Sequence, residues 1–265
     1  MVDSTDVLFH WDGNEFDLSI FRDCLRENNT AALRGLVGKN EALEAIARVR
    51  KNFDESLDEI HDPSDFMRMT SYLQKIVSVD PNPDAEYVGN RLGRNLRMMI
   101  DPMWGEESLG MREIFSKMIK FRNLLYGREE DFASSNVSDG LWSASRIHHY
   151  QTGKGYMEVH ADKILADVAE KSEMEGYYQV VLILSQKPDD FSEGGGFAQI
   201  GDKEIILEDE FEVGDIVVYD GRIQHGVKMI DPKVTNSDPS AGRYAAFVSL
   251  YKDLGGVKDF VDSLH

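Results

Sequence analysis

The sequence lacks most features of secreted, membrane-bound and disulfide-stabilised proteins. It has a single cysteine, Cys24, so no disulfide can form within the chain. Its N-terminal segment, MVDSTDVLFHWDGNEFD, holds neither the basic cluster nor the apolar run that a secretory signal requires. No stretch approaches the roughly eighteen consecutive apolar residues of a membrane span. We therefore expect a soluble cytoplasmic protein.

Basic residues are also scarce. Lys and Arg together number 29 against 48 for Asp and Glu, which gives a formal net charge of −19. Such a negative surface repels nucleic acid and anionic lipid, so we expect neither as a partner. The hydrophobic fraction of 42% is high enough for a packed core and argues against disorder. The length of 265 residues suits one large domain, or a domain with an extension.

The two halves of the chain differ in their apolar spacing. From about residue 17 to residue 127 the spacing is helical, and segments 62–79, 86–100 and 108–127 each have the pattern and the end signals of a helix. We expect residues 1–135 to form a mainly helical N-terminal region that packs against the rest.

Residues 136–265 have the pattern of an all-β structure. Short runs rich in β-branched and aromatic residues alternate with Gly, Asp and Asn, as in LWSASRIHHYQ, YYQVVLILSQ, DIVVYDG and RYAAFVSLY. Regularly spaced short strands of this kind predict a sandwich or barrel, not a doubly wound parallel sheet. The whole chain is thus predicted to be α+β.

The stretch EVHADK contains a histidine and an aspartate two residues apart. Alternate residues of a strand share a face, so His160 and Asp162 can both reach one metal ion. His225, in YDGRIQHGV, is a candidate for the third ligand. Two imidazoles and one carboxylate on one side of an ion suit Fe(II) with open positions, although the same set can also hold a catalytic zinc.

An arginine follows in the last predicted strand. Arg243, in AGRYAAFVSLY, offers a planar guanidinium that can pair with a carboxylate through two hydrogen bonds. The order His-x-Asp, Gly-rich turn, Gly-Asp-hydrophobic strand, His-Gly-Val and Gly-Arg-Tyr resembles the Fe(II)/2-oxoglutarate-dependent dioxygenases, most closely their prolyl-4-hydroxylase-like branch. The resemblance covers roughly residues 142–252.

This resemblance implies a double-stranded β-helix (jelly-roll or cupin-like) barrel as the catalytic core within residues 136–265. It implies that His160, Asp162 and His225 hold iron and that Arg243 binds the distal carboxylate of 2-oxoglutarate. Tyr150, ten residues before the first histidine, matches a tyrosine that hydrogen-bonds the same carboxylate in that branch.

Two details adjust what the resemblance implies. Many members that act on small molecules carry Ser or Thr two residues after the arginine, whereas this chain has Ala245, which gives Tyr150 more weight. Halogenating members replace the carboxylate ligand by Gly or Ala, so Asp162 favours oxygenation.

The predicted activity is oxidation of a C–H bond, most simply hydroxylation, with Fe(II), 2-oxoglutarate and O2. A small metabolite, amino-acid-derived or a natural-product intermediate, is the expected substrate; the oligomeric state is left open. The alternatives are desaturation, cyclisation or epimerisation by the same chemistry, and peptidyl-proline hydroxylation. Other classes are a non-catalytic jelly-roll binding protein and a zinc-dependent hydrolase.

Further residues of the predicted sheet are candidates for contact with substrate or with the metal ligands. His148 and His149 are adjacent, so in a strand they point to opposite sides and cannot both join one site. The remaining candidates are Arg146, Lys154, Tyr156, Glu158 and Gln179.

Overall fold

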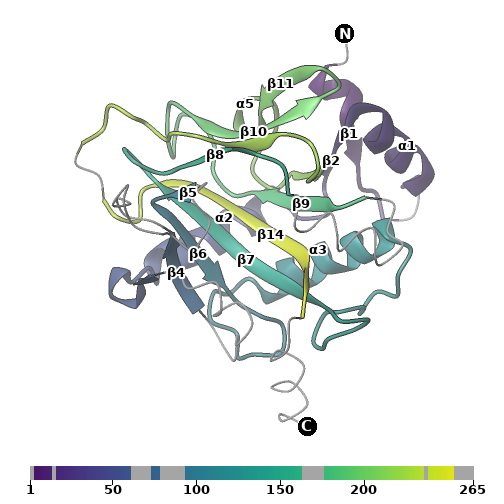
Figure 1. Cartoon of the computed structure of the whole chain (residues 1–265), viewed down its shortest axis with the longest axis horizontal. Coiled ribbons are helices and arrows are strands. Elements are labelled where there is room, and N and C mark those ends of the chain that lie inside the picture. Colours follow the sequence, from purple (N-terminus) through teal and green to yellow (C-terminus); the bar gives the residue numbers. More distant parts are fainter. Residues whose placement is uncertain are drawn as a thin grey trace.

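The computed structural model describes residues 3–13, 16–60, 73–77, 93–162, 176–235 and 238–253 (Figure 1). Its helical segments are η1 (Ser4–Val7), α1 (Leu18–Asn28), α2 (Lys39–Lys51), η2 (Glu55–Leu57), α3 (Arg112–Leu125) and α5 (Leu207–Glu210). Its strands are β1 (Leu8–His10), β2 (Thr30–Arg34), β3 (Glu59–Ile60), β4 (Leu73–Val77), β5 (Gly93–Arg94), β6 (Leu96–Ile100), β7 (Leu141–Gln151), β8 (Tyr156–His160), β9 (Tyr178–Ile183), β10 (Gly195–Ile200), β11 (Lys203–Ile206), β12 (Ile216–Asp220), β13 (His225–Lys228) and β14 (Gly242–Lys252).

A large sheet forms the centre of the molecule. Its nine strands run in the order β1-β2-β12-β9-β14-β7-β6-β4-β3. All neighbours are antiparallel except the two outermost pairs, β1 with β2 and β3 with β4, which are parallel. Strands from the first half of the chain therefore extend both edges of a sheet whose middle comes from the second half.

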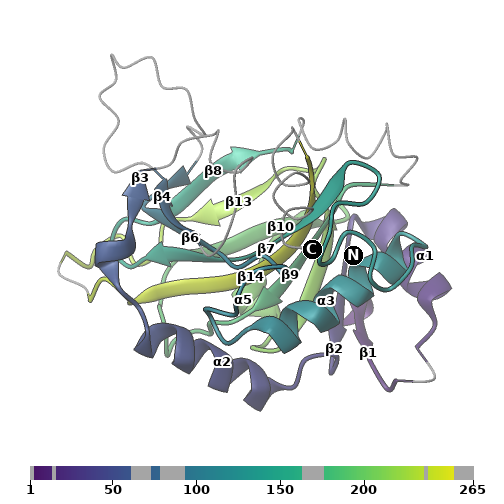
Figure 2. The same ribbon diagram turned by 90° about the horizontal axis from the view of Figure 1, so that it is seen from below.

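Helices α1, α2 and α3 cover one face of this sheet, and Figure 2 shows α2 and α3 lying along it. On α2 the buried positions are Ala42, Ala45, Ile46 and Val49, an i, i+3, i+4, i+7 stripe that turns one side of the helix to the core. The opposite side is mostly polar, with Leu43 and Ala47 as exposed apolar residues. The helices thus bury the outer face of the sheet and leave its inner face for the site.

A smaller sheet lies against that inner face. Its five strands are antiparallel and run in the order β11-β10-β13-β8-β5 (Figure 1). Side chains from both sheets share one apolar cluster, in which Leu96 and Tyr150 of the large sheet meet Met157 and Val227 of the small one. The molecule is therefore layered, with helices, large sheet and small sheet in that order.

The alternation along β7 determines which side chains reach the space between the sheets. Arg146, His148 and Tyr150 border a cavity there, whereas Ile147 packs into the cluster beneath the helices. His149 lies on the helical side, where its ring stacks on Tyr244 with centroids 4.2 Å apart. The predicted separation of the two adjacent histidines is confirmed, because strand residues alternate between faces.

The prediction of a helical first half is only partly right. Helix α3 confirms the segment 108–127, but residues 73–77 and 96–100, both expected in helices, form strands β4 and β6. Strand β6 pairs with β4 on one side and β7 on the other, and all its residues are buried. A strand buried on both faces has no alternating pattern, so its apolar run imitates a helix segment. Residues 62–72, 78–79 and 86–92 lie outside the described residues.

The mixed α+β class is as expected, whereas a closed barrel is not shown. The strand pairings of the described residues form two separate sheets, with no ladder joining them. The division at residue 135 stays a prediction. No helix in the described part of the chain is long and apolar enough to cross a membrane.

Candidate metal and co-substrate site

The structure brings the three predicted metal ligands together. His160 ends β8 and His225 begins β13, and these residues are paired opposite each other in the antiparallel ladder. Their ring centroids are 4.3 Å apart. The backbone N–H of Asp162 donates to the carbonyl of Gly221 at 2.7 Å, which holds the aspartate beside the end of β12. One ligand atom from each residue lies within 4.8 Å of the others, close enough to hold one metal ion.

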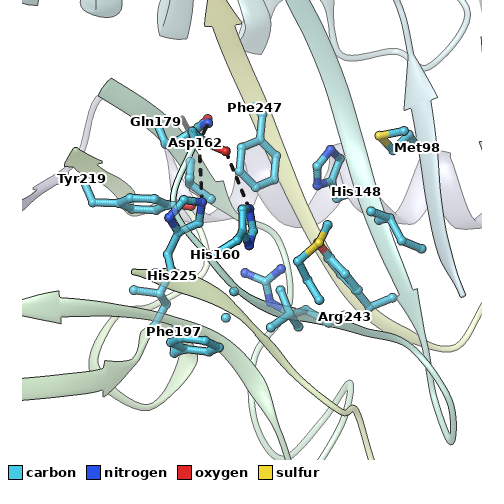
Figure 3. Close-up of a pocket in the computed structure, with 18 of the residues that line it drawn as sticks. Met98, His148, His160, Asp162, Gln179, Phe197, Tyr219, His225, Arg243 and Phe247 are labelled. Atoms are coloured by element: carbon cyan, nitrogen blue, oxygen red, sulfur yellow. Dashed lines mark hydrogen bonds and ion pairs between the residues drawn. The ribbon is translucent and has the colours of Figure 1, made fainter. Parts of the chain in front are cut away.

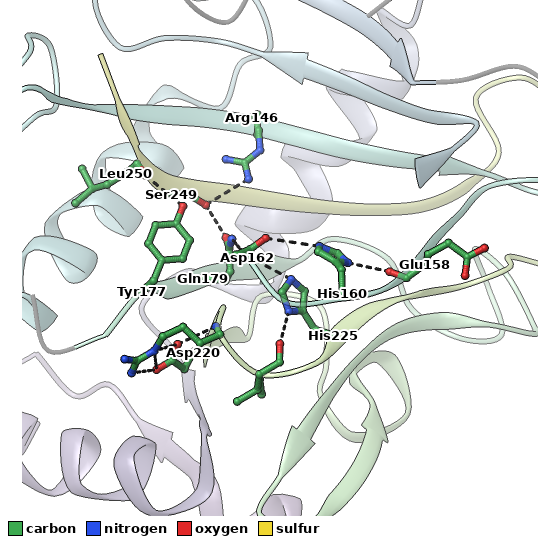
Figure 4. A network of polar contacts seen from close by, with 12 residues as sticks. Arg146, Glu158, His160, Asp162, Tyr177, Gln179, Asp220, His225, Ser249 and Leu250 are labelled. Atoms are coloured by element: carbon green, nitrogen blue, oxygen red, sulfur yellow. Dashed lines mark hydrogen bonds and ion pairs between the residues drawn. The ribbon is translucent and has the colours of Figure 1, made fainter. Parts of the chain in front are cut away.

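Backbone hydrogen bonds orient both histidine rings. Nδ1 of His160 lies 2.8 Å from the carbonyl oxygen of Glu158, and Nδ1 of His225 lies 3.0 Å from that of Ile223 (Figure 4). A carbonyl only accepts, so in each ring Nδ1 carries the proton and donates. Each Nε2 is left as a lone-pair donor, 3.6 Å from the Asp162 carboxylate. This arrangement is typical of metal-binding histidines.

The Asp162 carboxylate is held by a chain of neutral side chains. Gln179 Nε2 donates to Asp162 Oδ2 at 2.6 Å, and Ser249 Oγ donates to Gln179 Oε1 at 2.6 Å (Figure 4). Arg146 Nη2 donates in turn to Ser249 Oγ at 3.3 Å. The amide fixes one oxygen of the carboxylate, so Oδ1 is the oxygen most available to an ion. Such outer contacts orient metal ligands and tune their affinity.

Burial keeps the second histidine in the form that binds metals. Desolvation is the main cause that lowers the pKa of His225 below its ordinary value of 6.5, and the charge of Asp162 opposes that shift. The neutral imidazole is the ligand form, so the lowered pKa favours metal binding near neutral pH.

The triad opens into a cavity of about 210 Å³ between the two sheets. Figure 3 shows His160, His225 and Asp162 pointing toward one another, with Arg243 reaching the same space. Most of the other lining residues are apolar or aromatic, as is usual in small-molecule sites. The lining also includes Met98, Arg146, His148, Tyr150, Phe247 and Tyr251.

The predicted co-substrate residues lie side by side. Arg243 of β14 and Tyr150 of β7 are register partners, and the guanidinium carbon of Arg243 is 5.6 Å from the centre of the Tyr150 ring. Both side chains are buried and border the cavity. Burial raises the pKa of the Tyr150 hydroxyl well above its ordinary value, so this group is a permanent hydrogen-bond donor at neutral pH.

A glutamate holds Arg243 in place. Arg243 Nε donates to Glu208 Oε1, and Glu208 Oε2 accepts from the backbone N–H of Gly196 at 2.8 Å. A Cβ at Gly196 would collide with Arg243 Nη2, so glycine is needed for this close approach. Arg243 Nη1 is buried and has no hydrogen-bond partner among the described residues. A buried N–H of a guanidinium without an acceptor is costly, and a bound carboxylate would satisfy it.

The donor set therefore fits Fe(II) and 2-oxoglutarate. Two imidazole nitrogens and a single carboxylate suit a ferrous ion that keeps open positions. The unsatisfied Arg243 Nη1, in the same cavity, fits the distal carboxylate of a dicarboxylic co-substrate.

Sequence reasoning missed part of this site. Glu208 was not a candidate, because it lies in an acidic stretch, LEDE, that reads as a solvated surface. Gln179 and Arg146, which were candidates, do line the cavity. Lys154 and Tyr156 do not line it, and Glu158 contributes its backbone carbonyl to the His160 ring.

Comparison with solved structures gives the fold. The structure is similar to a 2OG-Fe(II) oxygenase family oxidoreductase from Burkholderia pseudomallei, with TM-score 0.50, 13% identity, and 94% of this chain and 98% of that chain covered. It is also similar to a Pseudomonas putida prolyl-4-hydroxylase, with TM-score 0.51, 14% identity, and 89% of this chain and 99% of that chain covered. A third similar structure is a prolyl hydroxylase from Trichoplax adhaerens in complex with a hypoxia inducible factor peptide fragment. Its TM-score is 0.52, its identity is 14%, and 89% of each chain is covered.

At these identities the likeness establishes the fold, which is the one shared by 2OG-Fe(II) oxygenases and prolyl hydroxylases. No protein-family model and no curated protein matches the sequence.

Proposed function

We propose that the protein is an Fe(II)- and 2-oxoglutarate-dependent oxygenase that hydroxylates a C–H bond of a small metabolite. The observation that carries the proposal is the convergence of His160, Asp162 and His225 in a cavity that also holds the unsatisfied guanidinium of Arg243. The fold supports it independently.

Each residue has a defined task in this proposal. His160, Asp162 and His225 hold the metal, and Arg243 and Tyr150 hold the distal carboxylate of 2-oxoglutarate. When bound, Fe(II) supplies the oxidation of a C–H bond by O2, coupled to conversion of 2-oxoglutarate into succinate and CO2. The apolar walls exclude water from the reacting atoms and orient the substrate.

The test is 2-oxoglutarate consumption by the purified protein. We expect aerobic succinate release on addition of Fe(II) and 2-oxoglutarate, stimulated by a metabolite pool, and a visible charge-transfer band when both are added without oxygen. If no succinate forms and no band appears, the chain is not an oxygenase. Hydrolysis supported by Zn(II) alone would favour a zinc hydrolase, and tight metal binding without turnover would favour a binding protein.

A peptide is the second candidate substrate, because one of the similar structures is a prolyl hydroxylase in complex with a peptide fragment. Proline-containing peptides in the same succinate assay test it. Stimulation by such peptides and not by the metabolite pool would replace the small-molecule proposal.

A further inference from the structure

A second buried arginine, Arg146, borders the same cavity. It lies on β7, it is 3% exposed, and its register partner on β14 is Phe247. Arg243 and its register partner Tyr150 lie four positions farther along the same pair of strands. At about 3.4 Å per residue, the two arginine positions are separated by about 14 Å along the strands. The cavity therefore has a cation at each of two places.

Among the described residues, Arg146 donates hydrogen bonds to neutral acceptors only. Its Nε donates to His148 Nε2 at 2.9 Å, its Nη1 to the carbonyl of Ala144 at 2.9 Å, and its Nη2 to Ser249 Oγ at 3.3 Å. Within the described residues no carboxylate lies within ion-pair distance of it. A buried charge is stable when it is paired, so a buried cation without an anion points to a ligand.

The other buried arginines of the described residues have different surroundings. Arg97 pairs with Asp58, and Arg243 pairs with Glu208. Arg122 has no carboxylate, but it donates four hydrogen bonds to neutral oxygens and does not border the cavity. Within the described part of the chain, Arg146 alone combines burial, a place on the cavity wall and the lack of an acidic partner.

Two N–H groups of Arg146 remain for a ligand. A guanidinium carries five, and the three hydrogen bonds above use one each from Nε, Nη1 and Nη2. One N–H therefore remains on each terminal nitrogen. A guanidinium with an N–H available on both terminal nitrogens can bind the two oxygens of a carboxylate.

Aromatic rings hold this guanidinium without neutralising it. Its carbon lies 5.0 Å from the ring centre of Phe247 and 5.0 Å from that of Tyr251. Such contacts fix the plane of the guanidinium and leave its positive charge unpaired by any anion of the described residues. With Met98 also on the wall, the space around Arg146 suits an apolar body next to the anionic group.

We propose that Arg146 is the substrate anchor, and that the substrate is a small carboxylic acid with an apolar or aromatic body. This inference rests on the proposed function, because it assigns Arg243 to 2-oxoglutarate and Arg146 to the molecule that is oxidised. The reacting C–H bond then lies between the carboxylate on Arg146 and the metal triad.

Binding of paired probes tests the proposal without knowledge of the natural substrate. The protein is loaded with Mn(II), which replaces iron without turnover, and with 2-oxoglutarate. Phenylacetate and 3-phenylpropionate are titrated by calorimetry beside phenylacetamide and 3-phenylpropionamide. A hydrogen bond to a charged group contributes about 1.5 to 3 kcal/mol, so we expect each acid to bind about 10- to 100-fold more tightly than its amide.

Matched variants locate the preference for the acid. Arg146→Met should bring each acid to within about threefold of its amide and change the 2-oxoglutarate dissociation constant by less than about threefold. Ser249→Ala, which removes one contact of the guanidinium but keeps its charge, should retain the preference. Each variant is compared at a temperature at which its circular dichroism spectrum shows that it is folded.

Any one of several binding results would overturn the inference. They are equal binding of acid and amide to the original protein, absence of acid binding up to about 10 mM, persistence of the preference in Arg146→Met, and loss of 2-oxoglutarate from the complex as the acids bind. Tighter binding of phenyl phosphate than of either acid would also reject a carboxylate. Failure of 2-oxoglutarate itself to bind, by contrast, is the failure of the proposed function.

Discussion

The two ends of the cavity both present a buried arginine, but the charge of each is treated differently. At one end Glu208 pairs with Arg243 and also accepts from the Gly196 backbone, so the guanidinium is fixed and partly neutralised. At the other end Arg146 is held by a histidine nitrogen, a carbonyl and a hydroxyl. The two arginines have the same charge and are both buried, but their partners give them different binding environments.

This difference matches the two ligands of the proposed reaction. The arginine that binds 2-oxoglutarate is used in every turnover. A guanidinium that is already fixed and oriented loses less conformational entropy when the ligand binds. An anchor for the substrate must distinguish one molecule from others, and an unneutralised charge rejects every neutral analogue. The comparison predicts distinct effects of the same substitution at the two ends.

The largest expected effect is on stability, and it differs between the ends. Arg243→Met leaves Glu208 as a buried, unpaired carboxylate, which should lower the free energy of unfolding by about 3 to 5 kcal/mol. Arg146→Met leaves only neutral acceptors without a donor, so we expect a loss of about 1 to 2 kcal/mol. Urea denaturation of both variants measures the difference.

A second substitution checks the cause. Adding Glu208→Gln to Arg243→Met removes the unpaired charge but keeps an oxygen for the Gly196 N–H, so most of the lost stability should return. If the double variant is no more stable than the single one, or if both single variants lose the same amount, the two ends do not differ in charge pairing.

The proposed metal triad is needed for reaction of both 2-oxoglutarate and the substrate. Loss of the metal should therefore abolish turnover of both. His160→Ala removes one of three proposed ligands, and we expect Fe(II) affinity to fall at least 100-fold, or about 2.7 kcal/mol. Metal content after dialysis and Fe(II) titration under anaerobic conditions measure it. Unchanged metal content in His160→Ala would remove this residue from the triad, whatever the state of the two arginines.

Lowering the pH should reduce the stability of the folded protein through His148, which accepts a hydrogen bond from Arg146. Burial, then the charges of Arg146 and Arg243, hold the pKa of His148 well below its ordinary value of 6.5. Below pH 6.5 the unfolded chain therefore takes up a proton that the folded chain does not, and stability falls as pH falls. The full contribution is present above pH 6.5, and one such proton changes stability by at most about 1.4 kcal/mol per pH unit.

Replacing His148 isolates this contribution. His148→Gln keeps a neutral acceptor for Arg146 Nε but cannot titrate, so its stability should fall less steeply between pH 6.5 and 5 than that of the original protein. His10→Gln, at an exposed position on β1, is the matched control for replacing a histidine by glutamine. Equal slopes for the original protein and His148→Gln would mean that His148 carries no such pKa shift.

The candidate metal ligands could be predicted from the sequence because local patterns and the order of motifs were enough to select them. Alternation along a strand was the reason for pairing His160 with Asp162, and the order of motifs supplied His225 and Arg243. In the structure β8 ends at His160, and the backbone of Asp162 is held by the carbonyl of Gly221. The site residues were thus identified as candidates without knowledge of the sheet order, and the register of β8 with β13 then brought the histidines together.

The rest depends on pairing between distant segments, which a single sequence does not reveal. Strand β6 was read as helix because both its faces are buried, Met99 in the cluster under the helices and Leu96, Met98 and Ile100 in the cluster between the sheets. No one-sided pattern remains. The contact of Glu208 with Arg243 spans 35 positions and forms only once α5 and β14 are both in place. The contrast between the two arginines therefore had no signal in the sequence.

The smallest expected effect tests whether the Arg146 end and the metal are independent. Ser249 connects them, since it accepts from Arg146 and donates to Gln179, which donates to Asp162. Ser249→Ala removes both hydrogen bonds of the hydroxyl, but only the neutral one to Gln179, worth about 1 kcal/mol, leads to the metal, so Fe(II) affinity should fall about fivefold or less. Gln179→Leu, which contacts the carboxylate directly, should reduce that affinity by about 10- to 100-fold and is the positive control. A loss in Ser249→Ala as large as in Gln179→Leu would mean that Arg146 acts on the metal through this chain, and that its end of the cavity is part of the metal site and not a separate anchor.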